Sequence, residues 1–365
     1  MPEAHGGNLE ASALRLGVSP RQVLDASASL APFPLPMRAR WAGWSTPSAP
    51  YPDRASLALR QCLAAIHVLD PAAVLPGNGA AELFTWAGRE AAASGFSLLP
   101  QPGFADYQRA LRCWSGPSQA LPLSLFWSAS EPLPFPAISA TRAVALWITN
   151  PHNPTGQLWS RASLEPLLQR FALVICDEAF LPLVPDGEAQ SLIPLVAECS
   201  NLVVIRSLTK LYGIAGLRLG YALAQPERLK RWAQWRDPWP VNAVASAVAQ
   251  ELLRSPQRYR AWCARVQRWV AREGGWLQRE LGALPGITPM PSAANFMLIR
   301  GEREGQPLSL RPLREALETR HRILLRDCRS FEGLDETWLR IGYQSRRGNR
   351  RIIRAMRQEL LGSRR

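Results

Sequence analysis

The sequence predicts an α/β protein, with a large domain built on a mainly parallel sheet and a smaller α+β domain. Three short apolar runs, at 144–149, 171–176 and 201–206, each end in polar residues and alternate with helix-like segments. This pattern is typical of parallel strands that are covered on both faces. A length of 365 residues also suits one large and one small domain better than a single core.

The other elements expected in the large domain lie before these three strands. Residues 1–50 are rich in Pro, Ala and Ser, and we expect an arm with little regular structure. After the arm, the hydrophobic pattern favours a helix over 80–93, a strand over 96–99 and a helix over 104–113.

After Lys230 the pattern changes, which predicts a second domain. A long helix is expected over 254–281, with Gly274 and Gly275 able to bend it. Strands are expected to follow over 295–300, 322–326 and 337–343. We therefore expect three parts: an arm over 1–45 that joins the small domain and the active site, a large domain over 46–240, and a small domain over 241–365.

The chain uses arginine for almost every positive charge. Its 43 basic residues include only two lysines, Lys210 and Lys230. Arginine cannot supply a deprotonatable amine, because its pKa is too high. A lysine in such a chain therefore favours a chemical role, which we assign to Lys210, whereas Lys230 has the pattern of a solvated helix position.

The net charge is +14, and arginines gather over residues 346–365. One hypothesis is nucleic-acid binding, which uses such basic patches. The other is an amphipathic final helix with its arginines in water and Ile352, Ile353, Met356 and Leu360 facing inward. No nucleic-acid motif accompanies the arginines, so we expect the amphipathic helix and no nucleic-acid partner.

Cysteine usage and hydropathy indicate the cellular compartment in which the protein is expected. The six cysteines are scattered without a CxxC pair, so we expect no disulfide and no zinc or other metal site. No apolar run reaches about 18 residues and no signal-peptide pattern begins the chain. We expect a cytoplasmic protein without a membrane partner.

Polar residues follow the predicted strands, where ligands of such sheets gather. The segment SLTK at 207–210 follows one strand, Asp177 ends another, and NPHNPTG at 150–156 follows a third. These residues suit pyridoxal phosphate (PLP), which needs an amine for a Schiff base, an acid at its pyridine nitrogen and donors for its phosphate. The candidates are Lys210 for the amine, Asp177 for the acid, Asn153 for the ring 3-oxygen, and Ser207, Thr209, Arg218 and the turn at Gly79 and Ala80 for the phosphate.

Each piece also has a simpler structural interpretation. The GNG turn at 77–79 could only cap a helix, and Asp177 is equally suited to capping the turn that follows it. Asn-Pro and Thr-Gly are ordinary turn signals.

Taken together, NPHNPTG at 150–156, DEAF at 177–180, SLTK at 207–210 and GLRLGY at 216–221 resemble the fold-type I aminotransferase superfamily. Their order and spacing agree with it, and the resemblance spans nearly the whole chain. It implies a fold-type I PLP-dependent transferase fold in which Phe104 stacks on the cofactor ring. The alternative for Phe104 is packing in the core.

Within that superfamily, YPD at 51–53 and ANF at 294–296 resemble the branch of histidinol-phosphate aminotransferases and threonine-phosphate decarboxylases. The resemblance implies a homodimer, with Tyr51 reaching the cofactor phosphate of the partner subunit. The start of the chain, with HGGN at 5–8 and DAS at 25–27, resembles the decarboxylases of cobalamin biosynthesis. It implies a set of residues that bind the substrate: His5, Gly6, Ser29, Asn153, Arg326 and Arg340.

Three positions depart from the family pattern. Ser29 and Ala31 stand in place of asparagines, one of which contacts substrate, and Phe180 stands in place of a tyrosine that reaches the ring 3-oxygen. Arg326 and Arg340 could instead be surface residues in so arginine-rich a chain. The resemblance implies a small phosphorylated amino acid as substrate and decarboxylation of L-threonine O-3-phosphate to (R)-1-amino-2-propanol O-2-phosphate. The alternative is an aminotransferase acting on histidinol phosphate.

Overall fold

The structure, a computed structural model, describes residues 6–128, 130–139 and 142–362. It is built around a seven-stranded sheet with the order β2-β8-β7-β6-β5-β3-β4. All neighbours are parallel except β8, which runs antiparallel to both β7 and β2. The strands are β2 (Val74–Asn78), β3 (Ser97–Gln101), β4 (Ser118–Pro122), β5 (Ala145–Thr149), β6 (Leu173–Asp177), β7 (Leu202–Ser207) and β8 (Leu219–Leu223).

Helices cover both faces of this sheet, as the continuous apolar strands predict. Ile175 and Val203 belong to a core that includes α4, α5 and α8, whereas Val174 and Val204 belong to a core that includes α3, α9 and α10. The predicted α/β class is therefore confirmed. The helices of this part are α3 (Leu57–His67), α4 (Ala80–Ser94), α5 (Ala105–Arg112), α6 (Arg161–Leu164), α7 (Leu208–Tyr212), α8 (Pro226–Trp235), α9 (Ala243–Leu252) and α10 (Pro256–Gly282).

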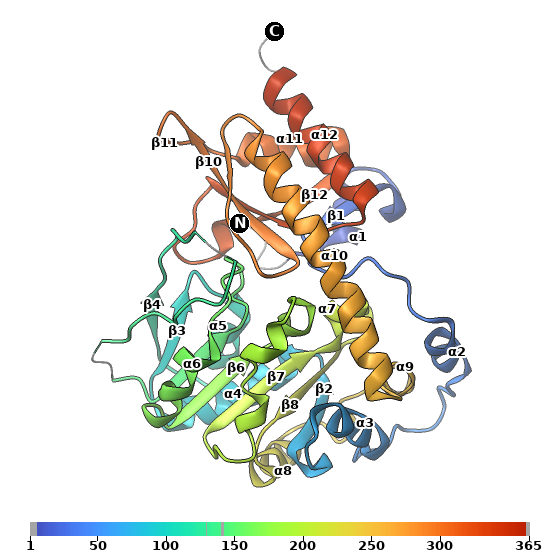
Figure 1. The fold of residues 1–365 in the computed structure, drawn as a ribbon. Helices are drawn as coiled ribbons and strands as arrows, with labels where there is room; N and C mark the ends of the chain where they lie inside the picture. Colours follow the sequence, from blue (N-terminus) through green and yellow to red (C-terminus); the bar gives the residue numbers. More distant parts are fainter. Residues whose placement is uncertain (1–5, 129, 140–141, 363–365) are drawn as a thin grey trace.

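A second sheet forms the upper part of the molecule in Figure 1, and α10 runs between the two parts. Its central strands β12, β13 and β10 are antiparallel, and β1 joins the edge parallel to β12. The first and last parts of the chain are thereby brought together. The elements are β1 (Leu24–Ala26), β9 (Ile287–Pro289), β10 (Phe296–Arg303), β11 (Gln306–Pro307), β12 (Ile323–Asp327), β13 (Trp338–Gly342), α11 (Arg311–His321) and α12 (Arg346–Gly362).

The prediction of an arm with little regular structure was wrong. Besides β1, residues 1–50 contain α1 (Leu9–Arg15) and α2 (Met37–Ser45). β1 is stabilised by pairing with β12 from the far end of the chain, and α2 packs against α9. Both are tertiary contacts that local propensity does not report. The division into three parts stays a prediction.

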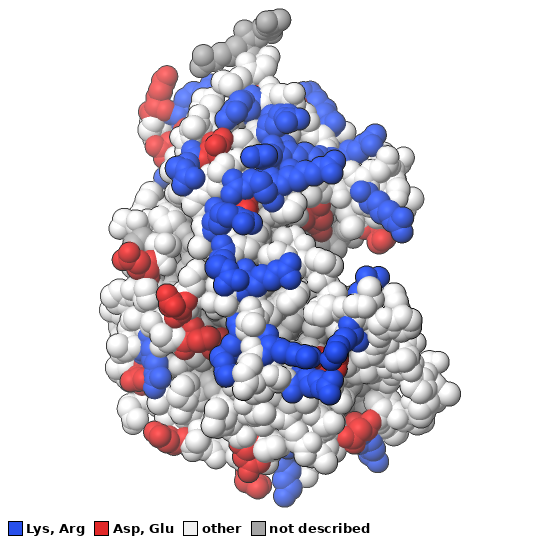
Figure 2. Space-filling view, turned by 45° about the vertical axis from the view of Figure 1, so that its right-hand side comes forward, with Lys and Arg blue, Asp and Glu red and all other residues white. Residues whose placement is uncertain are grey.

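The arginine-rich C-terminus forms the amphipathic helix that the sequence predicts. In α12, Ile352, Ile353 and Met356 are buried, Leu360 is half-buried, and Arg350 is among the arginines that face water. Figure 2 shows Lys and Arg side chains gathered along one face, most densely over its upper half. None of the helices among the described residues is long and apolar enough to cross a membrane.

Candidate active site

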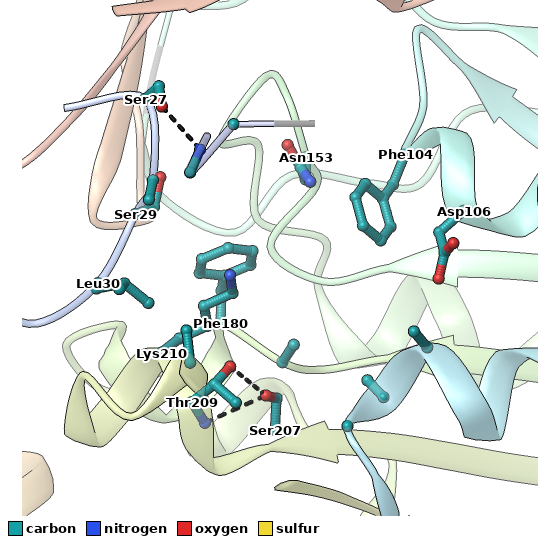
Figure 3. A pocket seen from close by; sticks show the side chains of 18 of the residues that line it. Ser27, Ser29, Leu30, Phe104, Asp106, Asn153, Phe180, Ser207, Thr209 and Lys210 are labelled. Carbon is teal, nitrogen blue, oxygen red and sulfur yellow. Dashed lines mark hydrogen bonds between the residues drawn. The ribbon is translucent and has the colours of Figure 1, made fainter. Parts of the chain in front are cut away.

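A cavity of about 550 Å³ lies where the carboxyl ends of the large sheet face the small sheet. Residues from both parts of the chain point into it (Figure 3). Nearly all the predicted site residues line it: Gly6, Ser29, Gly79, Ala80, Phe104, Asn153, Asp177, Ser207, Thr209, Lys210, Arg218, Arg326 and Arg340. His5 lies outside the described residues, and Tyr51 is not part of the cavity wall.

Lys210 reaches the cavity from α7, the short helix that follows β7. Ser207 caps this helix by accepting a hydrogen bond from the Thr209 N–H (3.3 Å), and the two hydroxyls lie 2.7 Å apart. The Lys210 ammonium lies 5.6 Å from the centre of the Phe180 ring. Burial, with the nearby charges of Arg340 and Arg218, lowers the pKa of Lys210 to about 8. The amine is therefore far easier to deprotonate than an exposed lysine.

Asp177 ends β6, where it caps the following turn and lines the cavity. Its Oδ1 accepts a hydrogen bond from the Ala179 N–H (2.9 Å), which caps the turn, and its Oδ2 accepts one from the Tyr107 hydroxyl (2.6 Å). Burial raises the pKa of Asp177 to about 6, and the hydrogen bond from Tyr107 opposes that rise. A buried carboxylate with a raised pKa gains from a cationic partner such as a protonated pyridine nitrogen.

Tyr107 was not predicted as a site residue. It lies on α5, and its hydroxyl also lies 2.8 Å from the Thr149 Oγ1 at the end of β5. Its position in an amphipathic helix is that of a core residue, and nothing in the sequence links it to an acid 70 residues later. Its contact with Asp177 depends on the fold, which places the ends of β5 and β6 side by side.

A cradle for an anion lies at the start of α4. Gly79 precedes the helix with φ 76°, and a Cβ added there would lie 2.6 Å from the Arg218 Nη2. Glycine thus lets the backbone approach the Arg218 guanidinium closely, and the first N–H groups of α4 are available to a ligand. With the Ser207 and Thr209 hydroxyls on the same wall, the cradle suits a phosphate.

Arg326 and Arg340 form a second cationic region on the small-domain side. They are direct partners in the pairing of β12 with β13 and are only 3% and 6% exposed, which excludes the surface interpretation. Arg340 donates to the Asn153 Oδ1 and, over 3.1 Å, to the Ser27 carbonyl. Arg326 lies 4.8 Å from the Phe331 ring centre and donates to the Ser330 hydroxyl.

Arg340 lacks a carboxylate partner within the described ranges. Burial and the nearby Arg326 lower its pKa to about 10, so it stays charged at neutral pH. A buried charge without a counter-ion is costly. The arrangement therefore favours binding of an anionic ligand here, and Asn153 keeps its amide N–H group as a donor.

Three further predicted residues are Phe104, Ser29 and Tyr51. Phe104 lines the cavity and also makes an edge contact with Tyr107, with ring centres 5.6 Å apart. It therefore packs on a core residue, and its stacking on the cofactor ring stays a prediction. The Ser29 hydroxyl is buried with no hydrogen-bond partner among the described residues, which leaves it for a ligand. Tyr51 is 78% exposed and stacks on Trp239 at 4.3 Å.

Comparison with known proteins agrees with this arrangement. A family model described as aminotransferase class I and II matches residues 23–356. The chain is 33% identical to a threonine-phosphate decarboxylase of Salmonella typhimurium, over 98% of this chain and 97% of that protein. It is 31% identical to histidinol-phosphate aminotransferase 2 of Bordetella bronchiseptica, over 91% and 89% of the two chains.

The fold is also similar to a solved structure that carries the cofactor. The histidinol-phosphate aminotransferase of Sinorhizobium meliloti, in complex with pyridoxal-5'-phosphate, superposes with a TM-score of 0.83 at 19% identity, over 100% of this chain and 96% of that one. The residues described above fit PLP: an amine with a lowered pKa, a buried acid and a phosphate cradle face one cavity.

Proposed function

Because the chain belongs to the class I and II aminotransferase family and is a PLP-dependent enzyme, we propose that it decarboxylates L-threonine O-3-phosphate. The product would be (R)-1-amino-2-propanol O-2-phosphate, for cobalamin biosynthesis. The observation that carries the proposal is the pair of buried arginines, Arg326 and Arg340. Two guanidinium groups suit a substrate that carries both a phosphate and a carboxylate, as threonine phosphate does. The dicarboxylate glutamate of a transaminase would suit them as well, so product identification decides between the two reactions.

Residues at one end of the cavity would hold the cofactor, and residues at the other end would hold the substrate. Bound PLP supplies an electron sink for the bond that breaks at the substrate α-carbon. Lys210 and Asp177 would hold it at its aldehyde carbon and pyridine nitrogen, and Ser207, Thr209 and Arg218 would hold its phosphate. Protonated Lys210 can deliver a proton to the α-carbon in place of the carbon dioxide that leaves, and it becomes neutral as it does so.

Arg326 and Arg340 would fix the substrate at its two anionic groups. Holding both ends restricts rotation about the bonds to the α-carbon, and this rotation decides whether a carboxylate or a hydrogen is lost. The buried Ser29 hydroxyl and the Asn153 amide are the neutral donors available beside them. The same residues therefore support binding and the choice of reaction.

Product identification tests the proposal. Purified enzyme with PLP should convert threonine phosphate to carbon dioxide and aminopropanol phosphate, detected by mass spectrometry, without added keto acid. Absence of carbon dioxide would contradict the proposal. The second candidate is transamination of histidinol phosphate, favoured by the Bordetella bronchiseptica relative. Formation of glutamate from 2-oxoglutarate that depends on histidinol phosphate would select it.

We also propose that the enzyme is a homodimer in which Tyr51 reaches the cofactor phosphate of the partner subunit. Tyr51 lies outside its own cavity and is 78% exposed. Trp41 and Trp44 on α2, in the preceding stretch of chain, are 60% and 64% exposed. Exposed aromatic side chains in this number are typical of a protein interface.

A further inference from the structure

A short strap at the start of the described chain, Gly6–Asn8, lies between two neighbouring cavities. One is the active-site cavity, and the other is a groove of about 370 Å³ beside α1, α11 and β12. Both are lined by Gly6, Ser27 and Arg326. The position of the strap therefore sets the boundary of the site beside Arg326.

Ser27 holds this strap through its hydroxyl. The hydroxyl donates to the Asp25 Oδ1 (2.6 Å). It also accepts a hydrogen bond from the Gly7 N–H (2.9 Å), which is drawn as a dashed line from Ser27 in Figure 3. Because a hydroxyl has one hydrogen, the bond to Asp25 turns a lone pair toward Gly7. Asp25 is itself fixed by the Ser27 N–H (2.9 Å).

The same residue also holds Arg340. The Ser27 carbonyl accepts a hydrogen bond from the Arg340 Nη2, and a Cβ added to Gly6 would lie 2.4 Å from that carbonyl oxygen. Only a glycine allows the strap to lie this close. The side chain of the buried Ser27 thus holds the strap, and its backbone carbonyl holds Arg340.

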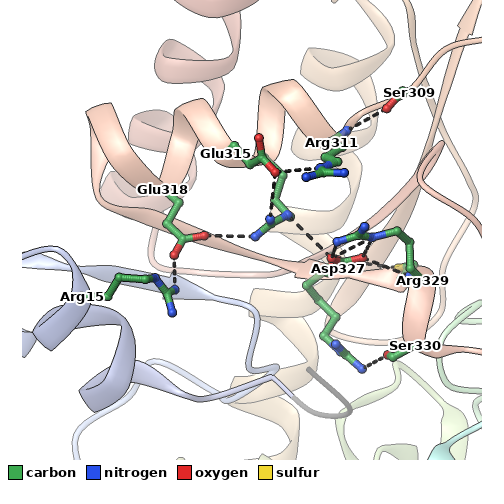
Figure 4. Close-up of polar contacts among 11 residues, drawn as sticks. Arg15, Ser309, Arg311, Glu315, Glu318, Asp327, Arg329 and Ser330 are labelled. Atoms are coloured by element: carbon green, nitrogen blue, oxygen red, sulfur yellow. Dashed lines mark hydrogen bonds and ion pairs between the residues drawn. The ribbon is translucent and has the colours of Figure 1, made fainter. Parts of the chain in front are cut away.

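A second anchor lies on the outer side of the strap. Arg15, at the end of α1, forms an ion pair with Glu318 on α11, and Glu318 also accepts from Arg314 (3.0 Å), as Figure 4 shows. The Arg15 side chain is 56% exposed, so solvent screens this pair. The bond from the exposed Gly7 N–H to the buried Ser27 hydroxyl is the restraint that acts on the strap itself.

We infer that Ser27 and Asp25 are positioning residues that clasp the Gly6–Asn8 strap over the substrate end of the cavity. The clasp would close the site around a bound anionic substrate on the side of Arg326 and Arg340. This inference rests on the proposed function for the identity of the substrate. The clasp itself is a property of the fold and is testable without turnover.

The test compares Ser27→Ala with Ser94→Ala. Ser94 is an exposed serine whose hydroxyl bonds only within α4. Ser27→Ala removes the acceptor of the Gly7 N–H, so amide hydrogen exchange of the segment that contains Gly7 should become faster. The KM for threonine phosphate should rise roughly tenfold, with kcat and the PLP absorbance nearly unchanged. Ser94→Ala should alter none of these.

Gly6→Ala provides an independent variant, because its Cβ cannot coexist with the Ser27 carbonyl. It should give the same faster exchange. Unchanged exchange at Gly7 in both variants would overturn the clasp, and so would a loss confined to kcat. If the wild-type enzyme does not decarboxylate threonine phosphate, the proposed function fails, while the exchange measurement still decides the clasp.

Discussion

At the scale of single residues, Lys210 differs from the other lysine by its position. It lines the cavity with a pKa lowered to about 8, whereas Lys230 is exposed on α8. We expect Lys210→Ala to abolish the visible absorbance of bound PLP and the activity while the protein stays folded. Lys210→Arg should be nearly as inactive, because a guanidinium is a poor nucleophile at neutral pH. Spectra and activity of these variants beside Lys230→Ala, which should behave as wild type, check this.

The two shifted pKa values predict how the apo-enzyme takes up PLP as pH changes. Lys210 has a pKa of about 8, so its reactive neutral form becomes more abundant as pH rises through 8 and levels off about one pH unit above that value. Asp177 has a pKa of about 6, so its charge, which attracts the pyridine nitrogen, is lost as pH falls below 6. The uptake rate, followed by absorbance, should therefore rise between pH 6 and 8. A rate independent of pH over this interval would contradict the assignment.

At the scale of elements, a buried ion pair joins the ends of β6 and β7, the strands beside Asp177 and Lys210. Glu178 follows Asp177, and Arg206 precedes Ser207; the Arg206 Nη2 lies 2.6 Å from the Glu178 Oε2, and both side chains are buried. Arg206→Leu would leave Glu178 without its counter-charge, which we expect to cost about 3–5 kcal/mol of unfolding free energy. Urea unfolding measures this loss.

A matched control is Arg311→Ala, which removes a fully exposed pair with Glu315. Solvent screens that pair, so the midpoint of urea unfolding should not move measurably. Equal shifts of the unfolding midpoint in Arg206→Leu and Arg311→Ala would contradict a stabilising role for the ion pair between β6 and β7.

Elements with a clear local pattern were predictable, and those that depend on distant partners were not. The buried strands β5, β6 and β7 and the helices α4 and α10 lie within one or two residues of their predicted ends, and α10 runs unbroken through Gly274–Gly275. β2, β4 and β8 were missed. β2 contains Pro76 and Gly77, β4 is largely exposed, and β8 is short and contains Gly220. Local apolar patterning does not report such strands.

The site shows the same division. Lys210 and Asp177 follow apolar strands, so the sequence indicates where they lie. Tyr107 acts through contacts with residues brought near by the fold, and no local pattern marks it. Ser27 lies in the DAS motif, but its contacts with Gly7 and Arg340 became visible only in the structure. Residues that bear the chemistry could be predicted, whereas those that position it required the structure.

At the scale of the whole molecule, the question is whether one chain or two chains form each active site. Substitution of the exposed Tyr51 can answer it. A closed two-fold dimer would bring each Tyr51 to the partner's cofactor phosphate. Variants with Tyr51→Ala and with Lys210→Ala can then be co-expressed with different tags, and the mixed dimer isolated. If Tyr51 crosses the interface, one site of the mixed dimer carries both changes and the other carries neither.

At limiting PLP, that mixed dimer should regain turnover that neither parent dimer shows, because its unaltered site keeps both the Lys210 amine and a partner Tyr51. If Tyr51 instead served its own subunit, every site would carry one change and turnover would stay lost. Light scattering provides the control, since the parents must be dimers of equal mass. A monomeric enzyme would contradict the shared site, and the 78% exposure of Tyr51 would then describe a solvated side chain.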